Sequence, residues 1–323
     1  MSSKDRLLSR AAERMYWLGR YVERTENTAR LLGVYGSLLF DLPVGTQFGW
    51  HTLIDLLGAE DTFGARYSKR DERNVVKFLI ADTSNASSIV ANVALARENA
   101  RTSRELIPSR GWEALDNMHH FVRENAAASL ARRARGEFLG EVVARCQQLA
   151  GLLDGTMSHD AAYHFIRLGQ ALERGDMTTR IVDIGASTHI AAVDDRAPML
   201  VEEGLGYESS IWLAVLNSSS GMQMYRRHYS ERVEPSDVVS FLLTDRDFPR
   251  AFRFCLGAAE RCLDCLPPNR SVKTVIRRTG RELDAADLEP LLNGGLHEFV
   301  DTLQLGLASA HEKINETWFY RDR

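Results

Sequence analysis

One segment of this chain occurs twice. Residues 11–30 read AAERMYWLGRYVERTENTAR and residues 161–180 read AAYHFIRLGQALERGDMTTR, and eight of the twenty aligned positions are identical without a gap. The identical positions include a glycine, a Glu-Arg pair and a final arginine: Gly19/Gly169, Glu23/Glu173, Arg24/Arg174 and Arg30/Arg180. Self-similarity at a fixed spacing is typical of a repeated structural unit. The chain is therefore expected to consist of two related halves.

The pattern within and around the repeat is helical. Apolar residues from Ala11 to Leu32 recur at spacings of three and four, and strand-like alternation is scarce in the rest of the chain. Helical stretches are predicted at 3–32, 84–106, 111–131, 136–153, 159–184, 207–228, 236–244, 248–265 and 285–318, with the segment from Gly185 to Pro198 among the breakers. We predict an all-α fold, a duplicated helical bundle with a pseudo-twofold internal repeat, whose units 1–155 and 156–323 pack as one domain.

Composition and charge argue against several classes of protein. The net charge of -4 gives no electrostatic reason to expect nucleic-acid binding. No segment approaches 18 consecutive apolar residues, so no membrane span is predicted. The start is charged from residue 4, unlike a signal peptide, and four cysteines do not make a disulfide framework. Cys255, Cys262 and Cys265 share a helical face and are interpreted as core thiols. We expect a cytoplasmic protein that binds neither nucleic acid nor membrane.

The repeated segment places charge beside an apolar helix face. Each copy puts a glycine, two carboxylates and an arginine on one side of its helix: Gly19, Glu23, Glu26 and Arg30 in the first, and Gly169, Glu173, Asp176 and Arg180 in the second. A glycine inside a helix costs about 1 kcal/mol relative to alanine, so its presence in both copies suggests that a backbone or a ligand approaches closely.

Carboxylates at a core boundary need partners, because an isolated buried charge is expensive. Three interpretations stay open: a structural network of ion pairs, a polar pocket between the halves for an amino-acid-like or peptide substrate, and a carboxylate-bridged metal site. Di-metal helical bundles favour Glu-x-x-His pairs, which neither copy has, so we expect no metal.

A second polar constellation lies in ARENARTSRE, residues 96–105. Because Arg97, Arg101 and Arg104 are spaced by four and three in a predicted helix, they are expected to share a face, either as a surface ladder of ion pairs or as a comb for acidic partners or phosphate. The chain has no glycine-rich phosphate loop and no nucleophile elbow. Any ATP chemistry is therefore expected on another polypeptide.

At these residues the sequence resembles the bacterial alpha-E domain family. The resemblance rests on LLSRAAERMYWLGRYVERTENTARLL near the start, ARENAR at 96–101, and the run from Trp212 through Tyr225 to FPRAFRF at 248–254. It implies an all-helical protein that works with a circularly permuted ATP-grasp ligase, often with a transglutaminase-like peptidase nearby. ATP and magnesium would then lie on the partner ligase, and this chain would bind no cofactor directly.

The resemblance also carries over individual positions: Glu23, Arg24, Glu26, Arg30, Arg97, Glu98, Asn99, Arg101, Tyr225, Arg226 and Arg250. Besides the arginines of the repeat and Arg97, the positions expected to bind the substrate are Glu98, Asn99, Arg101, Tyr225, Arg226 and Arg250. One position departs from the family, because Arg110 stands where an acidic residue often precedes the tryptophan, here Trp112. Any acid role at that point is therefore not expected in this chain.

The repeat and the resemblance together predict that the chain binds or positions an amino-acid or peptide substrate for amide bond formation. We call the charged residues on one side of each repeated helix a stripe. The residues expected to hold substrate carboxylates are Arg30, Arg180 and Arg97, with Arg24 and Arg174 beside them. The residues expected to hold an amine or act as a base are the stripe carboxylates Glu23, Glu26, Glu173 and Asp176. On this hypothesis alanine at Glu23 or Arg30 leaves the fold intact and abolishes activity. The alternatives are a non-catalytic scaffold that docks the ligase and a carboxylate-bridged metal enzyme.

Overall fold

The computed structural model describes residue 7 and residues 9–41, 49–193, 201–229 and 232–320. These residues are largely helical and include no strand, so the prediction of an all-α fold is confirmed. Among the helices of these ranges, none combines the length and the apolar character needed to cross a bilayer.

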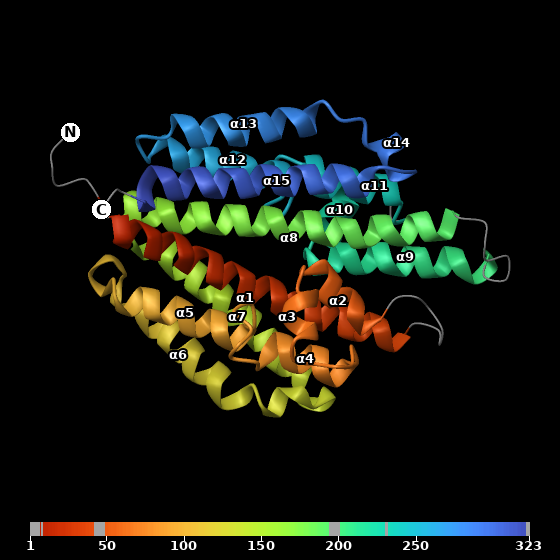
Figure 1. Ribbon diagram of the computed structural model, residues 1–323, viewed down its shortest axis with the longest axis horizontal. Coiled ribbons are helices and arrows are strands. Elements are labelled where there is room, and N and C mark those ends of the chain that lie inside the picture. The colour runs from red at the N-terminus through yellow and green to blue at the C-terminus, as the bar shows by residue number, and fades with distance from the viewer. Residues whose placement is uncertain (1–6, 8, 42–48, 194–200, 230–231, 321–323) are drawn as a thin grey trace.

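Two helices of equal length form the centre of the molecule (Figure 1). α1 (Ser9–Asp41) and α8 (Ala161–Val193) each have 33 residues and contact one another extensively. α1 also packs against α5 (Ile89–Arg101) and α7 (Arg132–Thr156), whereas α8 packs against α12 (Phe252–Asp264) and α15 (Leu296–Ile314). The two segments that contain the sequence repeat are therefore the central layer between the two sets of outer helices.

The outer helices follow each central helix in a similar order. After α1 come α2 (Trp50–Leu56), α3 (Glu60–Gly64), α4 (Glu72–Ile80), α5, η2 (Arg104–Leu106), α6 (Ser109–Asn125), η3 (Ala128–Leu130) and α7. After α8 come α9 (Val201–Ser218), α10 (Met222–His228), α11 (Pro235–Thr244), α12, α13 (Arg270–Asp284), α14 (Leu288–Leu292), α15 and η4 (Asn315–Phe319). This order agrees with two related units, and the boundary between α7 and α8 falls at residues 157–160. An origin by duplication stays a prediction.

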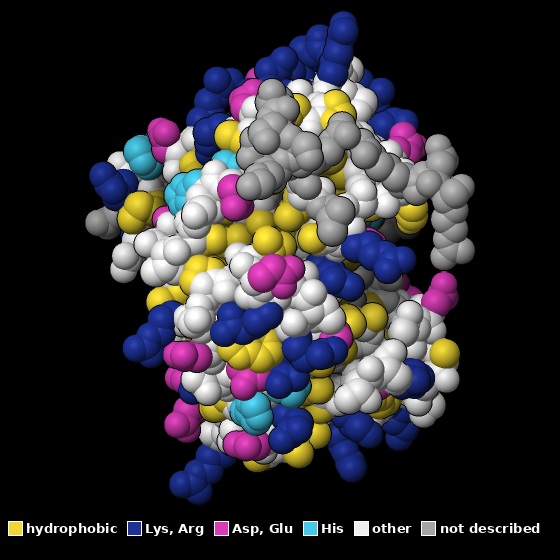
Figure 2. All heavy atoms as spheres, turned by 90° about the vertical axis from the view of Figure 1, so that its left-hand side faces the viewer, with side chains coloured by type: hydrophobic (Ala, Val, Ile, Leu, Met, Phe, Trp, Pro, Cys, Tyr) yellow, Lys and Arg dark blue, Asp and Glu magenta, His cyan; other side chains and the backbone are white. Residues whose placement is uncertain are grey.

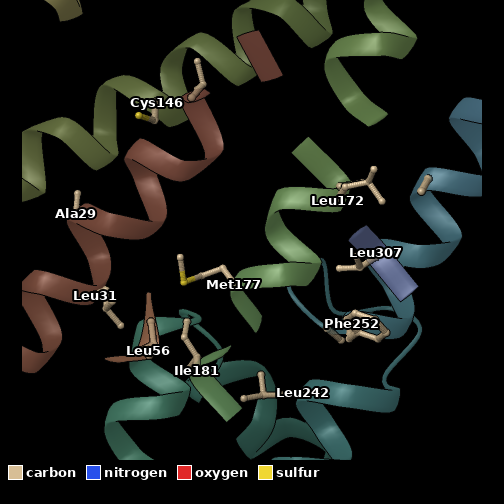
Figure 3. Close-up of a cluster of buried hydrophobic side chains, with 14 of the residues drawn as sticks. Ala29, Leu31, Leu56, Cys146, Leu172, Met177, Ile181, Leu242, Phe252 and Leu307 are labelled. Atoms are coloured by element: carbon tan, nitrogen blue, oxygen red, sulfur yellow. The ribbon is translucent and has the colours of Figure 1, made fainter. Parts of the chain in front are cut away.

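One continuous apolar core joins the two halves. Buried side chains from α1, α7, α8, α11, α12 and α15 belong to a single cluster, and Figure 3 shows several of them: Ala29, Leu31, Cys146, Leu172, Met177, Ile181, Leu242, Phe252 and Leu307. Figure 3 also shows Met177 of α8 beside the helix that carries Ala29 and Leu31. Since buried apolar area is the main favourable term in folding, the shared core ties the halves together.

Several helix boundaries differ from the prediction. Gly185 does not end its helix: α8 continues to Val193, and the Trp212 ring lies so close that a Cβ at Gly185 would be 2.5 Å from it. Tertiary packing explains this glycine better than helix termination does. The helix predicted at 207–228 is broken at residues 219–221, where Ser220 has a φ of 50°. The stretch predicted at 285–318 is broken at Asn293–Gly295, where two glycines have positive φ.

Four helices were missed by the sequence pattern, namely α2, α3, α4 and α13. The first three have only five to nine residues, too few for a 3.6-residue period to stand out. α13 follows Pro267–Pro268, and its exposed face is rich in arginine, so charge obscures its narrow apolar stripe of Val272, Ile276 and Leu283.

Candidate functional site

The central helices touch through the two repeated glycines. A Cβ at Gly19 would overlap the carbonyl oxygen of Ile166 and lie 2.9 Å from its carbonyl carbon. A Cβ at Gly169 would overlap the carbonyl oxygen of Tyr16 and lie 3.1 Å from its carbonyl carbon. Tyr16 and Ile166 occupy equivalent positions in the repeat, so the contact is reciprocal. The glycines are needed because each helix meets the backbone of the other at this point.

The two Glu-Arg pairs meet across the same crossing. Arg24 donates from Nε and Nη2 to the two oxygens of Glu173, over 2.6 and 2.9 Å. Arg174 donates from the same two nitrogens to the oxygens of Glu23, over 2.8 and 2.7 Å. Each glutamate therefore accepts a two-pronged bond from the arginine of the other copy, the geometry that makes Arg-carboxylate pairs strong and directional.

A second arginine reaches each glutamate, and here the halves differ. Arg20, one turn before Arg24, donates to Glu173 over 2.6 Å. Its counterpart in the repeat is Gln170, which does not reach Glu23. Instead Arg250, in the loop before α12, donates to Glu23 over 3.1 Å, to Glu26 over 2.7 Å and to Asn27 over 2.8 Å. Arg20 was missed from the sequence because comparison of the copies passes over a residue that is not repeated.

The remaining stripe residues form one ion pair within each helix. Arg30 donates to Glu26 over 2.6 Å and also reaches the hydroxyl of Ser220. Arg180 donates to Asp176 over 2.9 Å and to the carbonyl oxygen of Leu56 over 3.0 Å. These arginines thus join each central helix to a loop or helix end of the surrounding structure.

We call the six arginines and four carboxylates of this crossing the Glu-Arg network: Arg20, Arg24, Arg30, Arg174, Arg180 and Arg250 with Glu23, Glu26, Glu173 and Asp176. With every group ionised, the network has two more positive than negative charges. The network is partly buried, with side-chain exposures between 1% and 27%, and surplus positive charge in such a place is favourable for an anion because poorly hydrated charge is costly without a counterion.

The central glutamates are buried and remain ionised. Glu23 is 1% exposed and Glu173 is 3% exposed. Burial alone would raise their pKa values, but attraction to Arg174 and Arg250 lowers the pKa of Glu23 to about 2, and attraction to Arg20 and Arg24 lowers the pKa of Glu173 to about 2. A carboxylate with so low a pKa is a weak proton acceptor at neutral pH. The pairing therefore favours the structural interpretation of Glu23 and Glu173, and their catalytic role stays a prediction.

These pKa values predict how stability depends on pH. Both glutamates have a folded-state pKa below the ordinary value of 4.5, so they stabilise the folded chain above about pH 4.5. This stabilisation is expected to disappear as the pH falls from 4.5 toward 2. Urea unfolding at a series of pH values measures it, and a free energy of unfolding that stays constant over this interval would contradict the assignment.

The network also bears on the metal interpretation. Every oxygen of Glu23 and Glu173 already accepts a hydrogen bond from an arginine, and a divalent cation would have to displace those guanidinium groups. Across the described part of the chain, no cluster of three or more histidine, cysteine, aspartate or glutamate side chains has the arrangement of a metal site.

The ARENAR residues lie away from the crossing. Arg97 donates to Asp116 over 2.6 Å, and exposed Arg101 pairs with exposed Glu98 over 2.8 Å. Asn99 is half-buried, and its carbonyl oxygen accepts a bond from Thr102. The prediction that one helix face carries Arg97, Arg101 and Arg104 is wrong, because α5 ends at Arg101.

Trp112 lies between two arginines of this region, Arg97 and Arg104, which form a second cluster with it. The guanidinium groups of Arg97 and Arg104 lie 5.5 and 5.3 Å from the centre of its ring, within range of a cation–π interaction. Exposed Arg110, the departure from the family pattern, pairs with Glu113 over 3.2 Å. The cluster is thus held by local pairs and does not line the Glu-Arg network.

The other two positions taken from the family are also outside the network. Tyr225 is fully buried, and its hydroxyl donates to the carbonyl oxygen of Arg232 and accepts from the amide of Glu234, each over 3.3 Å, so it holds α10 to the residues just before α11. Arg226, next to it, is exposed on α10. Of the cysteines expected in the core, Cys255 and Cys262 are buried, whereas Cys265 follows the end of α12 and is exposed.

A model of the Alpha-E family, described as a predicted alpha-helical domain with a conserved ER motif, matches residues 7–319. The chain belongs to the Alpha-E family. Glu23-Arg24 and Glu173-Arg174 both match a Glu-Arg motif, and in this Alpha-E chain the arginine of each pair bonds to the glutamate of the other across the helix crossing.

Known relatives of this Alpha-E chain are larger proteins. Uncharacterized proteins of Mycobacterium bovis and Mycobacterium tuberculosis are 26% identical to it over 323 residues, which cover 91% of this chain and 34% of each relative. The chain thus spans about a third of the length of the curated relatives it matches. No solved structure matches it significantly.

Proposed function

We propose that this Alpha-E chain is the helical component of an ATP-dependent amide or peptide ligase system, in which it binds or positions an amino-acid or peptide substrate. A circularly permuted ATP-grasp ligase would be its partner and would hold ATP and magnesium. A transglutaminase-like peptidase is a possible further member of the system.

The observation that carries this proposal is the surplus of arginine in the Glu-Arg network. Six arginines against four carboxylates leave positive charge that a substrate carboxylate could neutralise. The relatives add support for a partner, since about two thirds of their length lies outside the match and could hold another domain. The assignment of the partner as a ligase is supported by the family resemblance.

The direct test is reconstitution with the ATP-grasp ligase. We expect the Alpha-E chain to raise amino-acid-dependent ATP turnover by about tenfold or more, because a positioned acceptor reacts faster than a free one. ADP release would be measured with each protein alone and with both, over a panel of amino acids and short peptides. Turnover that is the same with and without the Alpha-E chain would refute the proposal.

A scaffold without a substrate site is the second candidate. It is favoured by the internal pairing of all four stripe carboxylates, which leaves them occupied without any ligand. A scaffold would bind and stimulate the ligase, yet no substrate would bind to the Alpha-E chain alone. Ligand binding by the isolated chain therefore separates the two candidates.

A further inference from the structure

A pocket of about 210 Å³ opens between α8 and α12, beside the Glu-Arg network. Three arginines line it, Arg167 and Arg174 from α8 and Arg261 from α12, together with His164. Among the residues that the structure describes, no aspartate or glutamate lines it. A concave site with several basic groups and no acid is suited to an anion.

Two of these arginines have no acidic partner. Within the described ranges, Arg167 and Arg261 form no ion pair: Arg167 donates to Gln170 over 3.2 Å, and the guanidinium group of Arg261 lies 5.4 Å from the ring centre of Phe254. Arg174 binds Glu23 through Nε and Nη2, and its side chain keeps 20% exposure at the pocket. The pocket thus extends the positive charge of the network to solvent.

A second pocket, on α12 and α13, has both basic and acidic residues in its lining. It is lined by Arg253, Arg277 and Arg281 with Glu260 and Asp284. Arg253 donates to Asp284 over 3.0 Å and Arg277 to Glu260 over 2.9 Å. On the face shown in Figure 2, basic and acidic side chains lie together over the middle and lower parts, whereas the upper edge is mostly basic. The acid-free lining of the first pocket therefore distinguishes it from the second.

The walls of the pocket suggest the kind of anion. Phe254, Pro249, Ala258 and the buried thiols of Cys255 and Cys262 supply an apolar side. Burial raises the pKa of Cys255 to about 12 and that of Cys262 to about 11, so both stay uncharged thiols that do not repel an anion. An organic acid with a short hydrocarbon body matches arginines on one side and this apolar wall on the other.

We propose that the pocket between α8 and α12 binds a small organic acid with two carboxylates, such as an acidic amino acid or the end of an acidic peptide, through Arg167, Arg174 and Arg261. The inference that this ligand is the substrate of the ligase system rests on the proposed function. The inference that the pocket binds such an anion rests on the pocket alone.

The test uses the isolated Alpha-E chain with L-glutamate as the probe, at constant ionic strength set by sodium chloride. Saturating L-glutamate is expected to raise the melting temperature by about 3 °C, as a ligand that binds only the folded state does. Inorganic phosphate and L-glutamine are the comparison probes. If phosphate stabilises the chain and L-glutamate does not, the organic-acid assignment is overturned. If L-glutamine stabilises it as much as L-glutamate, the requirement for a second carboxylate is overturned.

Two variants locate the binding site. Arg167→Gln and Arg261→Gln remove no ion pair, so the fold is expected to persist, and each is expected to weaken L-glutamate binding about tenfold, the effect of losing one charge-assisted hydrogen bond. Arg281→Gln, in the second pocket and without an ion pair among the described residues, is the matched control and should bind as the parent does. Equal binding by the parent, Arg167→Gln and Arg261→Gln would overturn the proposal.

The outcome is separable from that of reconstitution. A chain that stimulates the ligase and binds another amino acid or peptide, but not L-glutamate, would overturn this inference and leave the proposed function standing. A chain that binds L-glutamate but leaves ligase turnover unchanged would do the reverse.

Discussion

Gly19→Ala is expected to destabilise the chain by about 3 kcal/mol or more, at the upper end of the cost of overpacking a core. The added methyl group would overlap the carbonyl oxygen of Ile166, and a backbone atom cannot rotate away as a side chain can. α1 and α8 would therefore have to move apart and loosen the ion pairs beyond the crossing. Urea unfolding followed by circular dichroism measures the loss.

Gly33→Ala is the matched control on the same helix. Apart from the neighbouring backbone of α1, no atom of the described residues lies within 4 Å of a Cβ at Gly33, so alanine there should be neutral or stabilise the chain by up to about 1 kcal/mol through its helix propensity. If Gly19→Ala were as harmless as Gly33→Ala, the close approach of the two backbones would be refuted.

Glu23→Gln is expected to cost about 3–5 kcal/mol, the range for breaking a buried ion pair on one side. Arg174 and Arg250 would both lose their charged acceptor in a poorly hydrated place. The same reasoning reverses the expectation from the sequence that alanine at Glu23 leaves the fold intact. The free energy of unfolding, extrapolated to water, is the measurement.

The control for this substitution is Glu98→Gln. Glu98 also pairs with an arginine, Arg101, but both side chains are more than half exposed, so the loss should be within about 1 kcal/mol. If Glu23→Gln and Glu98→Gln lowered the free energy of unfolding equally, burial would not make the ion pairs of the network more stabilising than an exposed pair.

Much of the central layer could be predicted from the sequence. The spacing of apolar residues predicted the helices, and a costly glycine in each copy indicated a close approach. The sequence also placed carboxylates at the core boundary, where they needed partners. It could not supply the partners, because the bonds of Arg24 with Glu173 and of Arg174 with Glu23 depend on how two distant helices cross.

The features that break the repeat were harder to find. Arg20 and Arg250 complete the network from positions that have no like counterpart, so only the folded chain brings them to the glutamates. The pocket is lined by both Arg167 and Arg261, which come from two helices that are far apart in the sequence. Helix α8 runs through Gly185 because Trp212 packs there, a tertiary contact that local propensity does not encode.

The central claim is that the Glu-Arg pairs of the two copies lock α1 against α8. A double-mutant cycle of Glu23→Gln and Arg174→Gln, measured by urea unfolding, tests it most directly. The account predicts a coupling energy of about 2 kcal/mol or more, because the two groups share a buried two-pronged bond. The claim would be contradicted if the double variant lost as much free energy of unfolding as the two single variants together, to within about 0.5 kcal/mol.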